Sequence, residues 1–315
     1  KDIPTKPAHF NVSKLYKGIK NYRFDILDQK KLKKTFLKIK PDYVFHLAAQ
    51  SLVKKSYEDP IVTWNTNLIG TLNILESLRA LNKSCTAVLI TSDKCYFNKE
   101  THKGYKESDT LGGEDPYSAS KAGSELVTSS YRRSFFKNSS DALIATARAG
   151  NVIGGGDWSA NRIIPDCVRA LIGGKSIEVR NPHATRPWQH VLEPLSGYVT
   201  LGSRLLKHGE GNMGSWNFGP PETAVHTVED VTRTAIKEWG SGEINVSEIS
   251  GKLHEANLLQ LNCAKATLEL GWKPRWGFER TMHETIKWYR QFHEGIDTLT
   301  TSASQLLSYE MSDND

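Results

Sequence analysis

Short apolar runs along the chain alternate with longer segments in which apolar residues recur every three or four positions. The runs have the length of buried strands, and the periodic segments have the spacing of one helix face. The predicted strands are 42–47, 87–90, 143–148, 216–218 and 258–261. The predicted helices are 66–81, 117–136, 162–172, 195–206, 227–239, 263–270 and 278–293. Strands that alternate with helices predict an α/β fold with a doubly wound parallel sheet.

The same pattern divides the chain into unequal parts. Residues 1–20 read as a connection, and 22–28 read as a short strand that ends in an acidic residue. We assign residues 1–150 to a first domain around the sheet, with contributions from 195–210 and 216–219. Residues 151–296 then form a smaller mixed α/β lobe. The polar residues 297–315 are expected to be a frayed tail.

Composition excludes several classes of protein. No apolar run approaches the roughly 20 residues that span a bilayer. The four cysteines lie far apart, which argues against a zinc site and a disulfide framework and favours a reducing cytoplasm. The net charge of +6 is explained by lysines around an apolar stripe of Leu32, Phe36 and Ile39. The aromatic residue among these lysines, Phe36, belongs to the apolar stripe, so we predict no nucleic-acid binding.

Small or polar residues follow three of the predicted strands, where ligands bind in doubly wound sheets. They are Ala48-Ala49, Ser92-Asp93 and Ala149-Gly150-Asn151. Further along, Tyr117 and Lys121 are one helical turn apart, so both side chains face the same way. A tyrosine has an ordinary pKa near 10, and a neighbouring lysine is expected to lower it. The residues thus predict proton transfer to or from a hydroxyl group.

Other polar clusters favour a phosphorylated substrate and no metal. Arg162, Arg180 and Arg186 are candidates for a diphosphate, because guanidinium groups match phosphate oxygens. Gly154-Gly155-Gly156 lacks the spacing of a dinucleotide-binding loop, and we interpret it as a mobile substrate loop. The histidines are isolated, so no metal site is predicted, and His190 is expected to be a hydrogen-bonded core residue.

Five segments carry a family resemblance: Phe45–Gln50, Thr91–Tyr96, Pro116–Lys121, Arg148–Trp158 and Arg186–Leu195. With them the chain resembles the extended short-chain dehydrogenases/reductases, and among these the CDP-glucose 4,6-dehydratases. The resemblance runs from about Asp25 to about Trp288. It implies a Rossmann-like domain with NAD as cofactor, a CDP-glucose substrate, and a cytoplasmic homodimer that forms through helices 68–81 and 125–136, without nucleic acid or membrane.

The resemblance also implies roles for individual residues. The cofactor residues would be Asp25, Ile26, Ala48, Ala49, Gln50, Asn67, Thr91, Tyr117 and Lys121. The substrate residues would be Ser92, Asn151, Asp157, Arg162, Arg180, Arg186 and His254. The catalytic residues would be Ser92, Asp93, Lys94, Tyr117 and Lys121. Among them, Ser92 would bind the sugar's 4-hydroxyl.

The reaction implied by the resemblance gives Asp93 a specific task. Oxidation at C4 acidifies the C5 proton, and loss of the C6 hydroxyl as water needs a general acid. We expect Asp93 to be that acid. In the dTDP-glucose relatives the next residue is a glutamate that removes the C5 proton, whereas this chain has Lys94. The residue that removes this proton therefore stays open.

One family feature is absent from the sequence. The glycine-rich strand–turn–helix that binds the NAD pyrophosphate is expected to precede Lys1, which favours a fragment of a longer protein. Two alternatives remain. A sugar-nucleotide 4-epimerase would share Tyr117 and Lys121 but would not need an acid at Asp93. A non-catalytic nucleotide-sugar-binding protein would explain the absent glycine motif.

Overall fold

A four-stranded parallel sheet forms the centre of the first domain. The computed structural model describes residue 3 and residues 5–81, 83–101, 103–137, 142–221, 224–246 and 258–312. The sheet has the order β1-β2-β3-β8, with strands Tyr43–His46, Thr86–Ile90, Leu143–Ala149 and Gly214–Phe218. In register, Phe45 lies opposite Val88, and Val88 lies opposite Ala145. The carboxyl ends of β1, β2 and β3 therefore meet at one edge.

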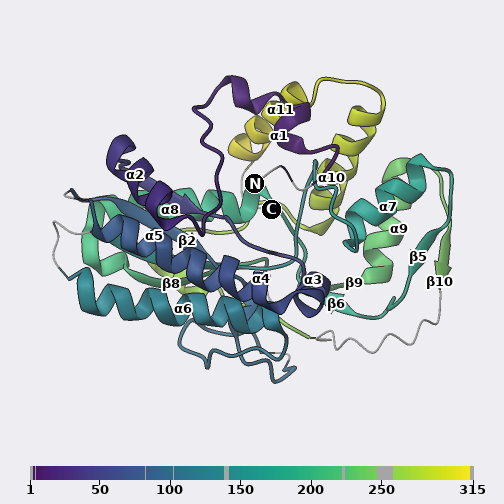
Figure 1. Ribbon diagram of the computed structural model, residues 1–315. Coiled ribbons are helices and arrows are strands. Elements are labelled where there is room, and N and C mark those ends of the chain that lie inside the picture. The colour runs from purple at the N-terminus through teal and green to yellow at the C-terminus, as the bar shows by residue number, and fades with distance from the viewer. Residues whose placement is uncertain are drawn as a thin grey trace.

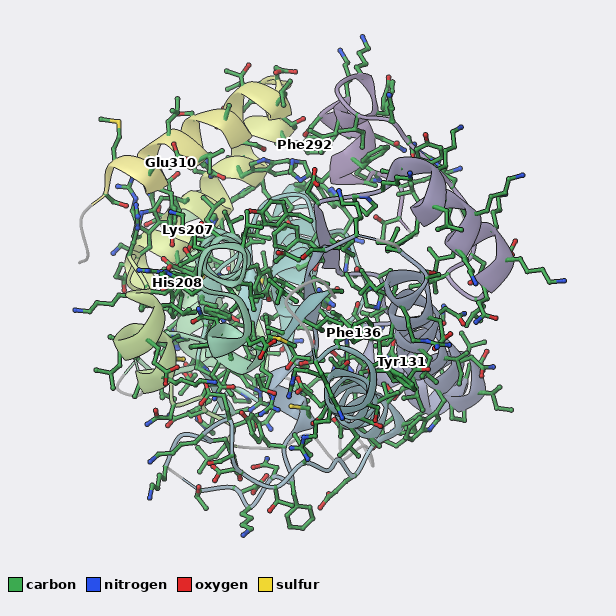
Figure 2. The ribbon with its side chains drawn as sticks, turned by 90° about the vertical axis from the view of Figure 1, so that its left-hand side faces the viewer. Tyr131, Phe136, Lys207, His208, Phe292 and Glu310 are labelled. Atoms are coloured by element: carbon green, nitrogen blue, oxygen red, sulfur yellow. The ribbon has the colours of Figure 1, made fainter. Side chains whose placement is uncertain are left out.

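Helices cover both faces of this sheet, which confirms the doubly wound α/β fold (Figure 1). On one face lie α2 (Gln29–Ile39), α5 (Gly70–Arg79) and α6 (Pro116–Phe135), against Ala87, Leu89 and Ile144. The other face is covered by α8 (Leu192–His208), against Val88, Trp216 and Phe218. Figure 2 views α6 and α8 nearly end-on, near the labelled pairs Tyr131 and Phe136, and Lys207 and His208.

A second core holds the smaller lobe together. Helices α7 (Ile163–Ile172), α9 (Val228–Trp239) and α10 (Phe278–His293) pack around Val168, Met282 and Ile286. Three two-stranded ladders complete the lobe. They are β5 (Ile177–Val179) with β10 (Ile244–Val246), β4 (Val152–Ile153) with β7 (Gln189–His190), and β6 (Thr185–Arg186) with β9 (His226–Thr227).

Short helical segments connect these elements. The α-helices are α1 (His9–Val12), α3 (Val53–Glu58) and α4 (Pro60–Trp64). The 3-10 and π segments are η1 (Leu15–Lys17), η2 (Asn65–Ile69), η3 (Asp93–Cys95), η4 (Gly209–Asn212) and η5 (Ala266–Leu270). None of the helices in the described part of the chain has the length and apolar character to cross a membrane.

The chain after residue 296 is not the frayed tail that was predicted. It forms α11 (Thr298–Met311), which Asp297 caps by accepting a hydrogen bond from the Thr300 N–H at 2.9 Å. The buried face of α11 is polar, and its hydrogen bonds replace apolar packing. Gln305 Nε2 donates to the Glu284 carbonyl at 2.6 Å, and Tyr309 Oη donates to Glu193 at 2.7 Å. Figure 2 shows Glu310 near the end of this helix.

Four smaller predictions also need correction. Residues 22–28 are not a strand, because β1 is an edge strand with no partner on its outer side among the described residues. Residues 258–261 contribute only one isolated bridge, between Tyr105 and Leu261. The loop at Gly155 is packed, since a Cβ there would lie 2.1 Å from Trp288. Ile39 is 48% exposed, so it does not continue the buried stripe of α2.

Candidate active site

Ser92 and Asp93 lie where β2 ends, and both are buried. Ser92 caps the short η3 turn, accepting a hydrogen bond from the Lys94 N–H at 3.2 Å. Its hydroxyl donates to Asp93 Oδ1 at 2.9 Å. The turn therefore holds a hydroxyl and a carboxyl group side by side at the end of the strand.

The end of β3 closes over Asp93. Asn151 Nδ2 lies 3.5 Å from Asp93 Oδ2, and the Asn151 backbone has a left-handed φ of 52°. A Cβ on Gly150 would lie 1.9 Å from Asp93 Oδ2, so only glycine fits beside this carboxyl group. Gly150 and Asn151 thus pack directly against the Asp93 carboxyl group.

We expect Gly150→Ala to displace Asp93 and to lower the free energy of unfolding by about 1–3 kcal/mol, the usual cost of overpacking. Urea unfolding measures the loss. Gly211→Ala is the matched control, since a Cβ at Gly211 meets nothing within 4 Å. Equal stability of the two variants would show that the chain relaxes around the added methyl group.

Tyr117 enters the crevice from the start of α6. Pro116 occupies the first turn, and Asp115 caps the helix by accepting from the Ser118 N–H at 2.9 Å. Burial raises the pKa of Tyr117 to about 12, while a hydrogen bond with Ser92 opposes this rise. Arg162 also acts to lower the Tyr117 pKa. The lowering expected from Lys121 together with a nicotinamide cation stays a prediction.

Lys121 lies one turn later and is buried. Its ammonium group donates to the Ile90 carbonyl at 3.2 Å, directly before the Thr91-Ser92 turn. Burial lowers the pKa of Lys121 to about 8, although Cys95 and Glu125 act in the opposite direction. Tyr117 and Lys121 therefore converge on the end of β2, as the sequence predicts.

We expect Lys121→Met to stabilise the chain by about 2 kcal/mol near neutral pH. The folded pKa lies below the unfolded one, so the buried ammonium costs about 3 kcal/mol below pH 8, and the lost Ile90 bond offsets about 1 kcal/mol. Because the unfolded chain binds more protons between pH 8 and about 10.5, the wild type recovers stability as pH rises. Urea unfolding at several pH values measures this, with exposed Lys54→Met as control. A gain that does not shrink with pH would contradict the assignment.

Several of the predicted cofactor residues lie where β1 and β2 end. Asn67 binds the backbone of Gln50 twice, accepting from its N–H at 2.8 Å and donating to its carbonyl at 3.0 Å. Asn67 also donates to Ser120 Oγ at 2.8 Å, so it fixes the segment that follows Ala48 and Ala49 to α6. The Thr91 hydroxyl donates to Glu125 at 2.6 Å. Asn67 and Thr91 thus shape the crevice through their contacts with the protein.

Asp25 and Ile26 lie on the other side of β1, in the irregular segment before α2. The Asp25 carboxylate accepts from the Leu27 N–H at 3.0 Å, and the Ile26 carbonyl accepts from Asn73 Nδ2 at 3.0 Å. Both residues are half-buried. Their position beside α5 comes from these contacts, without a strand.

Arg162 joins the two lobes at the crevice. Its Nη1 lies 3.0 Å from Asp157, and its Nη2 donates to Ser51 Oγ at 3.1 Å. Arg186 is buried, with Nη1 donating to the Thr185 carbonyl at 2.7 Å. Of these predicted substrate residues, the structure brings Arg162 and Asp157 together beside the Gln50–Ser51 segment.

Three other predicted residues are less constrained by the structure. Arg180 is exposed at the end of β5, and Lys94 is half-buried directly after Asp93. His254 lies outside the described residues. Within the described ranges, no group of three or more potential ligands could hold a metal ion. The roles of Arg180, Lys94 and His254 stay predictions.

Comparison with known proteins identifies the family. A model of the GDP-mannose 4,6-dehydratase family matches residues 6–285. The chain belongs to this family. Its sequence is 42% identical over 312 residues to the CDP-glucose 4,6-dehydratase of Salmonella typhimurium, covering 98% of this chain and 87% of that protein. It is 25% identical to the UDP-glucose 4-epimerase of Mycoplasma pneumoniae over 86% of this chain and 83% of that one.

A solved structure confirms the fold of this 4,6-dehydratase family member. The dTDP-glucose 4,6-dehydratase of Streptomyces venezuelae, with NAD and TYD bound, superposes with a TM-score of 0.74 at 24% identity. The match covers 88% of this chain and 81% of that one. The match therefore confirms the doubly wound fold that the sequence predicts.

Sequence reasoning missed three residues of the dehydratase crevice. Ser51 holds Arg162, and no motif marks it. His46 is buried beneath the site, and burial with the nearby Lys121 lowers its pKa to about 3, so it is neutral. Glu125 is buried one turn beyond Lys121. Its spacing of four residues from Lys121 was the available signal, because it places a carboxylate on the same helix face.

Proposed function

We propose that this chain is a CDP-glucose 4,6-dehydratase that forms CDP-4-keto-6-deoxyglucose and water. The observation that carries the proposal is the buried Ser92–Asp93 pair, bonded at 2.9 Å and adjoining Tyr117. It places a carboxyl group, which a dehydration needs as an acid, next to the groups that serve oxidation at C4. The 42% identity to the Salmonella relative supports cytidine as the base.

The cofactor that we propose is NAD, and the residues present fit it. Small Ala48 and Ala49 follow β1, and the Asn67 clamp holds the next backbone amide in place. Lys121 has N–H donors beyond the one that binds Ile90, and these suit ribose hydroxyl groups. Asp25 and Ile26 would lie at the adenine end. When bound, NAD supplies the hydride acceptor at C4 and the hydride donor at C6.

The chain's own groups then move the protons. Tyr117 takes the proton of the 4-hydroxyl group, to which the Ser92 hydroxyl also bonds. A pKa of about 12 makes the phenol a weak base in the protein alone, so added positive charge in the crevice would assist it. Asp93 donates a proton to the departing C6 oxygen. Arg162 and Arg186 bind the diphosphate, and Asn151 orients the sugar.

The same proposal includes a homodimer in the cytoplasm. Apolar side chains lie exposed beside α6: Ile61 is 71% exposed, Trp64 37% and Ile69 40%. They adjoin the helices predicted to form the dimer, and burying them in a second copy would gain hydrophobic free energy. The four cysteines are free thiols, which suits a reducing compartment.

Incubation of the chain with NAD and CDP-glucose tests the function. NMR is expected to show the 4-keto-6-deoxy sugar, with turnover at least about 10-fold faster than for dTDP-glucose. Fluorescence titration first establishes that NAD is bound. Absence of the keto sugar while NAD is bound would contradict the proposal, and formation of the C4 epimer would favour the epimerase.

A further inference from the structure

A second cleft lies away from the crevice, at the β8 edge of the sheet on the α6 side. It encloses about 920 Å³ between the outer half of α6, the loop at 106–111 and β8. The Ser215 hydroxyl of β8 donates to Glu125 of α6 at 3.0 Å, which joins the two walls. Of the residues assigned to the crevice, Glu125 alone also lines this cleft.

The side chains that line the cleft are mostly cations and hydroxyl groups. The cations are Lys106, Arg132, Arg133, Arg148 and Lys265. The serines are Ser108, Ser129, Ser130, Ser134 and Ser215. Three carboxylates are also present, Glu107, Asp109 and Glu125. Glu125 and Arg148 neutralise each other at 2.7 Å, which leaves four cations facing two carboxylates.

The two remaining carboxylates are bound to backbone amides. Glu107 accepts from the Asn217 N–H at 2.9 Å, and Asp109 accepts from the Lys106 N–H at 2.8 Å. Neither bond involves a cationic side chain. The groups that line the cleft therefore carry two more positive charges than negative charges.

Arg132 is the cation that most needs a partner. Its side chain is half-buried, and among the described residues no hydrogen bond or ion pair is formed by its guanidinium. Burial lowers the pKa of Arg132. Glu125 acts to raise this pKa, and Arg133 and Arg148 act to lower it. Lys265 shows the same direction, because burial, Arg132 and Arg148 lower its pKa against Glu107 and Glu269.

A position in the last turn of a helix explains part of this pattern. Arg132 and Arg133 are the basic residues of the last turn of α6, where cations are favourable near the helix dipole. The helix dipole also stabilises exposed cations, so it does not explain why the Arg132 side chain is half-buried beside Lys265 and Arg148. Among the described residues, the half-buried Arg132 side chain, with its five N–H donors, still has no acceptor.

We propose that this cleft binds a small ligand through a phosphate or diphosphate group. A dianion matches the two unbalanced positive charges. Arg132 and Arg133 supply the fork geometry that suits phosphate oxygens, and Ser129, Ser130 and Lys106 supply further donors. The floor of the cleft is the Arg148–Glu125 pair, and Glu125 binds Thr91, the residue before Ser92.

Titration of the full chain with inorganic pyrophosphate, followed by calorimetry, tests the proposal. The wild type is expected to bind saturably, and Arg132→Gln to weaken binding at least about 10-fold. The Arg132 guanidinium forms no hydrogen bond among the described residues, so Arg132→Gln is expected to fold. Arg290→Gln is the matched control, because it also removes one positive charge from the last turn of a helix, in this case α10.

Arg162→Gln separates the cleft from the crevice, where a pyrophosphate group could also bind. Binding that survives Arg162→Gln and weakens with Arg132→Gln supports the cleft. Absence of saturable binding, equal weakening by Arg132→Gln and Arg290→Gln, or loss only with Arg162→Gln would overturn the proposal. Dissociation of a dimer by Arg132→Gln, with no pyrophosphate bound, would also overturn it, since the cations would then face a second copy.

Discussion

Replacement of Asp93 by asparagine is expected to slow formation of the keto sugar by about 10²–10⁴-fold, the usual contribution of a general acid. An asparagine oxygen can still accept the Ser92 hydrogen bond at 2.9 Å, but the side chain has no proton to give to the C6 oxygen. Oxidation at C4 depends on Tyr117 and Lys121 and is expected to persist. Single-turnover absorbance separates the oxidation from the elimination.

Asp42→Asn is the matched control for this variant. The Asp42 carboxylate is 81% exposed and pairs only with Lys83 at the surface among the described residues, so its loss is expected to leave the rate unchanged. Full activity of Asp93→Asn would show that another group protonates the leaving oxygen. Unchanged interconversion of C4 epimers in Asp93→Asn would favour the epimerase alternative.

Much of the sheet and its helices could be predicted from sequence because local signals coincide with burial. The strands β2 and β3 are covered on both faces, so they read as continuous apolar runs. The Asp115-Pro116 cap marks the start of helix α6, and small residues mark its buried face. Tyr117 and Lys121 follow from that start, and the site residues at strand ends follow from the fold.

What could not be predicted depends on contacts distant in sequence. Residues 22–28 have strand composition, but strand formation needs a neighbour to pair with. Helix α11 looked unstructured because its buried face carries Thr301, Gln305 and Tyr309. The partners of Gln305 and Tyr309 lie 21 and 116 residues away. The pKa of Tyr117 likewise depends on the folded surroundings, because burial is the largest influence on it.

The crevice therefore rests on a polar layer beneath it. Glu125 accepts hydrogen bonds from Thr91 of the β2 end, from Thr146 of β3 and from Ser215 of β8. Burial opposes its ionisation, but Arg148 and the hydrogen bonds from Thr91 and Thr146 outweigh that cost and lower the pKa of Glu125. Helix α6 is thereby fixed against the strands whose ends carry Ser92 and Gly150.

Replacement of Arg148 by methionine is expected to lower the free energy of unfolding by about 3–5 kcal/mol, because it leaves the Glu125 charge buried and unpaired. Both side chains are only 2% exposed, and the pair distance is 2.7 Å. Arg148 also donates to Tyr96 Oη at 2.7 Å, and that bond is lost too. Urea unfolding near neutral pH measures the change.

The exposed pair Arg79–Glu76 provides the matched control, since it has the same chemistry at 2.8 Å but lies at the surface. Arg79→Met is expected to cost less than about 1 kcal/mol. Adding Glu125→Gln to Arg148→Met removes the unpaired charge while keeping an acceptor for Thr91, so the double variant is expected to recover part of the loss. Equal costs for Arg148→Met and Arg79→Met would show that water reaches Glu125. No recovery in the double variant would show that the loss comes from packing and the Tyr96 bond rather than from the buried charge.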